Sequence, residues 1–329
     1  METDRRQQLI AAKLRAIIKV QLGDSSEVTH VSTSFSRGAA CVAGNSSWVL
    51  VSEDPQRALG AALAWTQLHA PVGVELNLIT EGDAGIATRR AAYFKRPIRV
   101  WSIKNVSLVE VPPLPLPVRI EAKGNHLALR NLIEEGGAEL VVEHGIVVGE
   151  VEGLEVCRVL DNDAGESRLE VGVGAHDREA FALLHGHLPP VRAVKQIVEA
   201  VQPHRQTAIG SHPLNRIAAE RLLRARVIRQ PEFVGAAFLQ VAEPPVARLN
   251  LKEDTPCVAY GRDMDDKPVV VVFAFGIDLE VVPFAADARA WIDPSALLVV
   301  AVPERDRHRA LQAMADDLTN DCRIVGLSL

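Results

Sequence analysis

A proline-rich segment constrains this 329-residue chain more than any other stretch. Val111-Pro-Pro-Leu-Pro-Leu-Pro117 cannot form a helix or a central strand, because proline lacks a backbone N–H and restricts the residue before it. Such a segment is typical of a stiff, extended linker, and the alternative is a docking site for a partner on the Pro-Leu repeat. It predicts an N-terminal α/β domain at residues 1–110, a proline-rich linker at 111–123 and a C-terminal α/β domain at 124–329.

Before the linker, the spacing of apolar residues predicts helices that alternate with strands. Residues 3–21 repeat apolar side chains three and four positions apart, which is typical of an amphipathic helix. The predicted strands are 28–34, 39–42, 48–52, 73–80 and 98–103, and the further helices are 54–69 and 84–94. Strand, helix and strand in succession require a crossover, so we expect parallel pairing there and a mixed sheet.

After the linker, the pattern predicts a second α/β domain that carries a helical insertion at about 177–230. A helix is expected over 125–144, with Gly136-Gly137 as a candidate break. Strands are expected over 145–160, with a break at Glu152-Gly153, and over 168–174 after a turn at 161–165, and irregular chain is expected over 231–256. The remaining expected elements are strands at 257–260, 269–275, 297–302 and 322–327 and helices at 280–291 and 306–318.

The last segment resembles the first, which indicates either an internal duplication or two segments that share a common β-α-β pattern without a common origin. Arg99-Val-Trp-Ser-Ile103 matches Arg323-Ile-Val-Gly-Leu327, and both follow a strand–helix–strand–helix pattern. We therefore expect residues 47–103 and 268–327 to share one strand order with parallel pairing.

The stretch from Leu132 to Ala180 is the most acidic part of the chain. It contains thirteen carboxylates against Arg158, Arg168 and Arg178, a formal charge of −10. Most of these acids are expected to be solvated, because an isolated buried charge is costly. The carboxylates on the predicted hairpin are the informative ones.

Glu155 and Glu170 lie on the two hairpin strands, where a turn brings them near each other. Two adjacent carboxylates raise each other's pKa or share a cation. Carboxylate oxygens suit Mg²⁺, so these two are the candidate catalytic residues and, with His176, the candidate metal ligands. The alternative is that both lie on a solvated face and pair with Arg158 and Arg168.

The charge reverses between Val191 and Arg229, where eight cations face two acids. One interpretation is a solvated helix face that also neutralises the acidic hairpin. The other is a surface that contacts the phosphates of a nucleic acid. The candidate substrate-binding cations, taken from both segments, are Arg158, Arg178, Lys195, Arg216 and Arg224.

The order α-β-β-β-α-β resembles that of the restriction-endonuclease-like, or PD-(D/E)XK, superfamily. The resemblance covers residues 1–103 and, with more departures, 125–329. It implies an acid on the second strand and an acid-x-Lys on the third, which together hold Mg²⁺. The nearest match in this chain is Glu155 followed by Glu170-Val-Gly172, with glycine where the superfamily has lysine.

Histidines suggest a different metal site, since imidazole and carboxylate ligands suit Zn²⁺ or Mn²⁺. His176, Asp177, Glu179, His185 and His187 are close in sequence, but they do not form an H-E-x-x-H motif. Ordinary polar histidines are the alternative. The four cysteines form no C-x-x-C pair and are expected to be buried thiols.

Composition favours a cytoplasmic protein that does not enter a membrane. No apolar run is long enough to span a bilayer, and the first residues lack the apolar core of a signal peptide. A net charge of −6 and only fourteen aromatic residues offer neither a general attraction to nucleic acid nor an extended stacking surface.

Two classes of function follow. The first is a non-catalytic binding or structural protein with a degenerate nuclease-like fold. The second is a Mg²⁺-dependent nuclease or phosphodiesterase that acts on nucleic acid. The absence of the lysine favours the first class.

Overall fold

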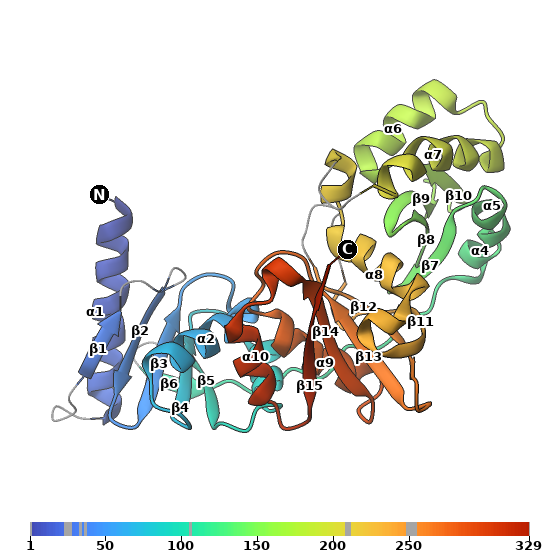
Figure 1. Ribbon diagram of the computed structural model, residues 1–329. Coiled ribbons are helices and arrows are strands. Elements are labelled where there is room, and N and C mark those ends of the chain that lie inside the picture. The colour runs from blue at the N-terminus through green and yellow to red at the C-terminus, as the bar shows by residue number, and fades with distance from the viewer. Residues whose placement is uncertain are drawn as a thin grey trace. The chain divides into compact units, whose positions relative to one another are not determined.

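The structure is a computed structural model that describes residues 2–22, 28–32, 35, 38–104, 107–207, 212–247 and 255–328. Over these residues the strands form three open sheets flanked by helices, which confirms the predicted α/β class (Figure 1). The chain forms two compact units. Unit 1 comprises Met1–Leu116, Ile277–Asp287 and Arg307–Ile324, and unit 2 comprises Pro117–Gly276, Ala288–Asp306 and Val325–Leu329. The first boundary lies within the proline-rich segment, and the C-terminal part of the chain contributes to both units.

The N-terminal sheet has its strands in chain order. Its elements are α1 (Glu2–Leu22), β1 (Val28–Ser32), β2 (Gly38–Ala43), β3 (Ser46–Val51), α2 (Leu59–His69), β4 (Glu75–Thr80), α3 (Gly85–Ala91), β5 (Ile98–Lys104) and β6 (Ser107–Glu110). The pairs β1–β2 and β2–β3 are antiparallel, β3–β4 and β4–β5 are parallel, and β6 lies antiparallel to β5. Leu14 and Ile18 of α1 are buried against Leu50 of β3. The amphipathic spacing of this helix therefore matches its packing.

The middle sheet is antiparallel throughout, in the order β10-β9-β8-β7. Its elements are α4 (Gly124–Leu127), α5 (Arg130–Glu135), β7 (Glu139–Glu143), β8 (Ile146–Val151), β9 (Leu154–Asp161), β10 (Ser167–Val171), α6 (Gly174–His185) and α7 (Pro190–Arg205). The core joins Ile133 of α5, Val156 of β9 and Val194 of α7. The predicted hairpin is the pair β9–β10.

The C-terminal sheet has the order β11-β12-β13-β14-β15. Its elements are α8 (Ala219–Arg229), β11 (Ala236–Ala242), β12 (Cys257–Asp263), β13 (Pro268–Phe273), α9 (Val281–Ile292), β14 (Leu297–Pro303), α10 (Arg309–Asp316) and β15 (Cys322–Leu327). The first two pairs are antiparallel and β13–β14 is parallel. Leu223 of α8 and Phe273 of β13 lie in its core.

Three strands of the structure, β6, β7 and β11, were not predicted from the sequence. In place of one helix over 125–144, the structure has the two short helices α4 and α5, and residues 139–143 form β7. Gly136 and Gly137 follow the end of α5 at Glu135, and the β-branched residues Val141 and Val142 favour a strand after them. Residues 236–242, expected to be irregular, form β11, and residues 107–110 form β6. All three are edge strands, which pair on one side only and so carry a weaker apolar pattern.

The first and third sheets agree in strand order, as the predicted repeat requires. In each, a helix precedes two antiparallel pairs, and strand–helix–strand connections follow. Each also has a β-bulge near the start of its first strand, at Val28/His30 and at Ala236/Phe238. A common origin of the two segments stays a prediction.

The turns that follow α3 and α10 meet inside unit 1. Phe94 follows α3, Leu318 follows α10, and these residues form an isolated antiparallel bridge. The backbone N–H of Lys95 donates to the carbonyl of Asp317 at 2.7 Å, and that of Thr319 donates to Tyr93 at 2.8 Å. The contact is thus symmetric about Phe94 and Leu318.

A buried ion-pair cluster also holds unit 1 together. Asp287 of α9 is fully buried and accepts hydrogen bonds from Arg89 at 2.8 and 2.7 Å and from Arg90 at 3.3 Å. Glu280 accepts from Arg90 at 2.9 Å and from the backbone N–H of Gly60 at 2.7 Å. Burial raises the pKa of Glu280 despite the nearby arginine.

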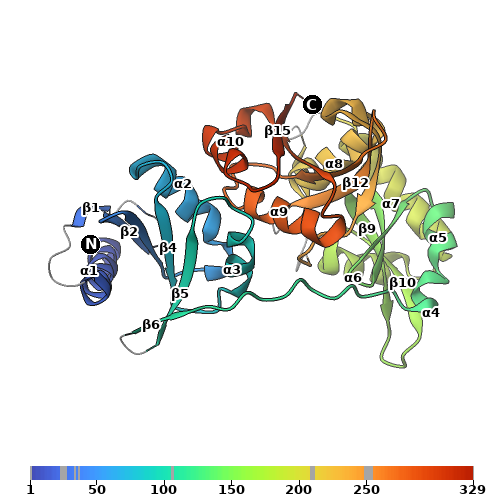
Figure 2. The same ribbon diagram turned by 90° about the horizontal axis from the view of Figure 1, so that it is seen from below.

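The proline-rich segment leaves β6 in an extended path (Figure 2). Most of its side chains are exposed, but the guanidinium of Arg89 donates to the carbonyls of Leu114 and Pro115 at 2.7 Å each. The N–H of Leu114 donates to the carbonyl of Gly85 at 2.9 Å. This part of the segment is therefore fastened to unit 1.

Candidate functional site

The predicted carboxylate Glu155 is buried on β9 and fully engaged by arginines. Its two oxygens accept from Nε and Nη2 of Arg158 at 2.9 and 2.7 Å. Oε1 also accepts from Nη1 of Arg178 at 3.0 Å. These charge-assisted, bidentate hydrogen bonds occupy the carboxylate oxygens that would otherwise coordinate a metal ion.

The second predicted carboxylate, Glu170 of β10, reaches the same arginine. It accepts two hydrogen bonds from Arg168, at 3.0 and 2.6 Å, and lies 3.6 Å from Nε of Arg178. Arg178 is buried on α6, so its guanidinium bridges Glu155 and Glu170. The two carboxylates are brought together through an arginine.

Gly172 has no room for the side chain that the nuclease motif requires. It follows β10 with φ +142°, a conformation that residues with a side chain rarely adopt. A Cβ at this position would lie 2.6 Å from the backbone N of Arg178 and 2.8 Å from its Cα. A lysine would therefore displace the start of α6.

The other predicted site residues lie apart from this cluster. His176, Lys195 and Arg216 are exposed, and Arg224 is buried in a different ion-pair network. Within the parts of the chain that the structure describes, no group of three or more His, Cys, Asp or Glu side chains is placed to hold a metal ion. Glu155, Glu170 and His176 do not form such a group.

Two buried arginines of α8 join two carboxylates of the middle sheet, a network that sequence patterns did not reveal. Arg221 contacts Glu143, and its Nη1 donates to Glu150 at 2.5 Å. Arg224 donates to Glu143 at 3.0 Å and to Glu150 at 3.3 Å. Burial alone would raise the pKa of the Glu143 carboxyl, but the charges and hydrogen bonds of Arg221 and Arg224 together have the larger effect. The pKa is therefore lowered, and the carboxylate stays ionised.

A third buried arginine, Arg205, donates hydrogen bonds to backbone carbonyls instead of to carboxylates. It donates to the carbonyls of Glu152 at 3.2 and 2.7 Å, of Leu214 at 2.9 Å and of Ile217 at 3.0 Å. Burial lowers its pKa to about 10, against the attraction of nearby glutamates. The fold therefore buries three of the eight cations between Val191 and Arg229, namely Arg205, Arg221 and Arg224.

A cavity of about 550 Å³ lies beside the hairpin, between β10, α6 and the start of α7. Apolar side chains line part of it, including Leu169, Phe181 and Leu188. Arg168 and Arg178 line it as well. Its volume and mixed lining are those of a small-molecule or side-chain binding pocket.

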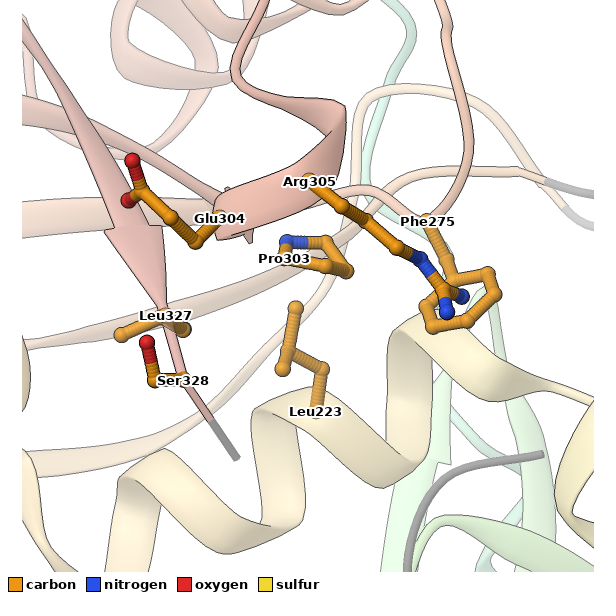
Figure 3. A pocket seen from close by; sticks show the side chains of 7 residues that line it. All are labelled: Leu223, Phe275, Pro303, Glu304, Arg305, Leu327 and Ser328. Atoms are coloured by element: carbon orange, nitrogen blue, oxygen red, sulfur yellow. The ribbon is translucent and has the colours of Figure 1, made fainter. Parts of the chain in front are cut away.

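A second cavity, of about 330 Å³, lies where β13, β14 and β15 end (Figure 3). In the close-up, Leu223 rises from α8 toward Pro303, with Leu327 and Ser328 at one side. The guanidinium of Arg305 lies 5.1 Å from the ring centroid of Phe275. In open α/β sheets, ligands commonly bind at the carboxyl ends of strands.

The comparisons with known proteins add no relative. No family model, no curated protein and no solved structure matches the chain. Among the described helices, none is long and apolar enough to cross a membrane.

Proposed function

We propose that the protein is a non-catalytic binding protein, and that its acidic hairpin is an ion-pair cluster that positions α6. One observation carries the proposal: the guanidinium of Arg178 lies between Glu155 and Glu170, where a nuclease would hold its cation. A metal ion would have to displace a buried arginine, and an unpaired buried charge is strongly unfavourable.

Gly172 supports the same proposal, because a motif lysine has no space there. The predicted phosphate-binding cations support it too. Arg158, Arg178 and Arg224 are engaged by carboxylates inside the fold. Only Lys195 and Arg216 of the predicted five are exposed, too few for a strong contact with a phosphate backbone.

A binding role needs a site, and the cavity beside β10 has the size and lining of one. We propose the cytoplasm as the compartment. Cys41, Cys157, Cys257 and Cys322 are all free and buried, and free thiols are the rule in reducing compartments.

Titration calorimetry with Mg²⁺ and Mn²⁺, together with cleavage assays on single- and double-stranded DNA and RNA, tests the proposal. The parent protein should show no saturable binding of either ion and no metal-dependent cleavage. Glu155→Gln and Glu170→Gln should change neither result. Cleavage that requires Mg²⁺ and disappears in both variants would instead establish the nuclease.

A further inference from the structure

The ion-pair cluster beside β10 carries more positive than negative charge. Its two carboxylates, Glu155 and Glu170, face three guanidiniums, those of Arg158, Arg168 and Arg178. Three cations and two anions leave the cluster with a charge of +1. A further negative group would balance it, because a charge that is partly shielded from water is stabilised by a nearby charge of opposite sign.

Arg178 is the member of the cluster that has hydrogen-bond donors to spare. Its side chain is nine-tenths buried, yet of its three nitrogens only Nη1 donates to a described group, the carboxylate of Glu155 at 3.0 Å. Nε lies 3.6 Å from Oε2 of Glu170 and makes no hydrogen bond, and Nη2 meets no acceptor among the described residues. Buried N–H groups normally have acceptors. The spare donors therefore point to an acceptor from outside the described chain.

The cavity of about 550 Å³ lies against this arginine, since Arg168 and Arg178 both line it. The other lining residues are mostly apolar and come from β10, α6 and the start of α7. None of the described lining residues is Ser, Thr, Asn or Gln, so a ligand meets no neutral hydroxyl or amide side chain. The remaining polar residues are His185 and Glu179, and Glu179 is exposed, where water and salt screen its charge. The cavity thus suits a ligand with one anionic end and a hydrocarbon body.

We propose that this cavity binds a small organic monocarboxylate with an apolar body. Its carboxylate accepts hydrogen bonds from the guanidiniums of Arg168 and Arg178, whose planar donor geometry suits two carboxylate oxygens. Its body packs on Leu169, Phe181 and Leu188. A single negative charge is what the cluster lacks. The proposal rests on the binding role argued above and names the ligand class.

Titration calorimetry of the full chain with octanoate, octanol and octylammonium tests the proposal, because these probes differ mainly in the head group. Octanoate should bind saturably and at least about ten-fold more tightly than octanol, since only a carboxylate forms charge-assisted hydrogen bonds with the arginines. Octylammonium should bind more weakly than octanol, because it adds to the positive charge of the cluster. Octanoate that does not bind, or that binds no more tightly than octanol, would overturn the proposal.

Arg168→Gln tests the charge of the cluster at an exposed position, where the substitution should leave the fold intact. It should weaken the binding of octanoate at least about ten-fold and leave that of octanol unchanged. Arg192→Gln is the matched control, because Arg192 is exposed on α7 and does not line the cavity. This variant should bind octanoate like the parent. An equal loss in both variants would mean that only the overall charge attracts octanoate, and the proposal would fail.

Two substitutions on α6 locate the bound probe. Ala182 is exposed and lines the cavity, so Ala182→Trp should fill the space and abolish the binding of octanoate and octanol alike. Ala180 is exposed on the same helix and does not line the cavity, so Ala180→Trp should bind both probes like the parent. Octanoate binding that survives in Ala182→Trp would place the site elsewhere and overturn the proposal.

The carboxyl end of a peptide offers the same chemistry as a free organic acid, and N-acetyl-leucylleucine distinguishes the two sources. It should bind more weakly than octanoate, because the lining has no neutral polar side chain for its amide groups. Binding as tight as that of octanoate, or tighter, would assign the cavity to a peptide terminus and overturn the free acid as ligand.

The two proposals fail separately. Octanoate that does not bind leaves the absence of metal-dependent cleavage intact. Metal-dependent cleavage that requires Glu155 and Glu170 would overturn the non-catalytic role, while the octanoate titrations of the parent and of Arg168→Gln stand on their own.

Discussion

At the scale of single residues, the candidate site is decided by one glycine and one arginine. Gly172 allows the chain to turn from β10 into α6 at a backbone angle open to few other residues. That turn brings Arg178 to Glu155 and Glu170. The residue that departs from the nuclease pattern is therefore the one that the ion-pair cluster requires.

Gly172→Ala should lower the free energy of unfolding by more than the about 1–2 kcal/mol expected for a positive φ alone. The added Cβ also meets the backbone of Arg178 at 2.6 Å. Gly165→Ala is the matched control, because Gly165 has φ +79° with nothing within 4 Å of the added Cβ. Urea denaturation of both variants measures the difference, and equal losses would show that the close approach is unimportant.

The chain has two tyrosines, and both should ionise at a higher pH in the folded protein than in the unfolded chain. Burial, and then the charge of Asp287, raises the pKa of Tyr93 to about 12, and the pKa of Tyr260 is also raised. The folded state thus holds the phenolic protons above pH 10, so stability should fall as the pH rises from about 10 toward 12. Absorbance at 295 nm should show the phenolic transition of the native protein at higher pH than that of the protein in denaturant; transitions at the same pH would contradict the prediction.

At the scale of elements, α8 is held from two sides. Its apolar face packs in the C-terminal core through Leu223 and Val227. Its arginines Arg221 and Arg224 join β7 and β8 through Glu143 and Glu150. One helix thus links two sheets of unit 2.

Arg224→Met should destabilise unit 2 by about 3–5 kcal/mol, because it leaves Glu143 and Glu150 buried with one guanidinium fewer. Arg216→Met, on an exposed side chain nearby in sequence, should change stability by less than about 0.5 kcal/mol. Thermal and urea unfolding of the two variants provide the comparison. Similar stabilities would mean that the α8 network contributes little.

Elements with strong local patterns were predictable from the sequence, and elements defined by distant partners were not. The β9–β10 hairpin followed from β-branched strands around an Asx-rich turn. Edge strand β7 was missed because its five residues follow a helix-like stretch and pair on one side only. The partners of Arg224 lie 74 and 81 residues away, so no spacing rule could assign them.

At the scale of the whole molecule, the chain crosses between units more often than the proline-rich segment suggests. Unit 1 combines the N-terminal sheet with α10, part of α9 and the first residues of β15. Asp287 and Glu280 in the C-terminal part hold Arg89 and Arg90 of α3. Cutting the segment after Leu116 would therefore leave unit 1 assembled from two pieces.

Limited trypsin digestion should cut first after Arg119, which is exposed and lies beyond the carbonyls of Leu114 and Pro115 that Arg89 holds. The fragments 1–119 and 120–329 should then elute together in gel filtration. The reason is that the buried cluster around Asp287 and the bridge between Phe94 and Leu318 join residues from both.

Asp287→Ala should make the nicked fragments separate at lower denaturant concentration than in the parent, because it leaves buried Arg89 and Arg90 without their shared carboxylate. Asp163→Ala is a suitable control, since Asp163 is an exposed residue of the β9–β10 turn. Fragments of the parent that separate without denaturant would instead show two independent domains joined by the proline-rich segment. Co-elution of the parent fragments, lost selectively in Asp287→Ala, would establish that unit 1 is completed by the C-terminal part of the chain.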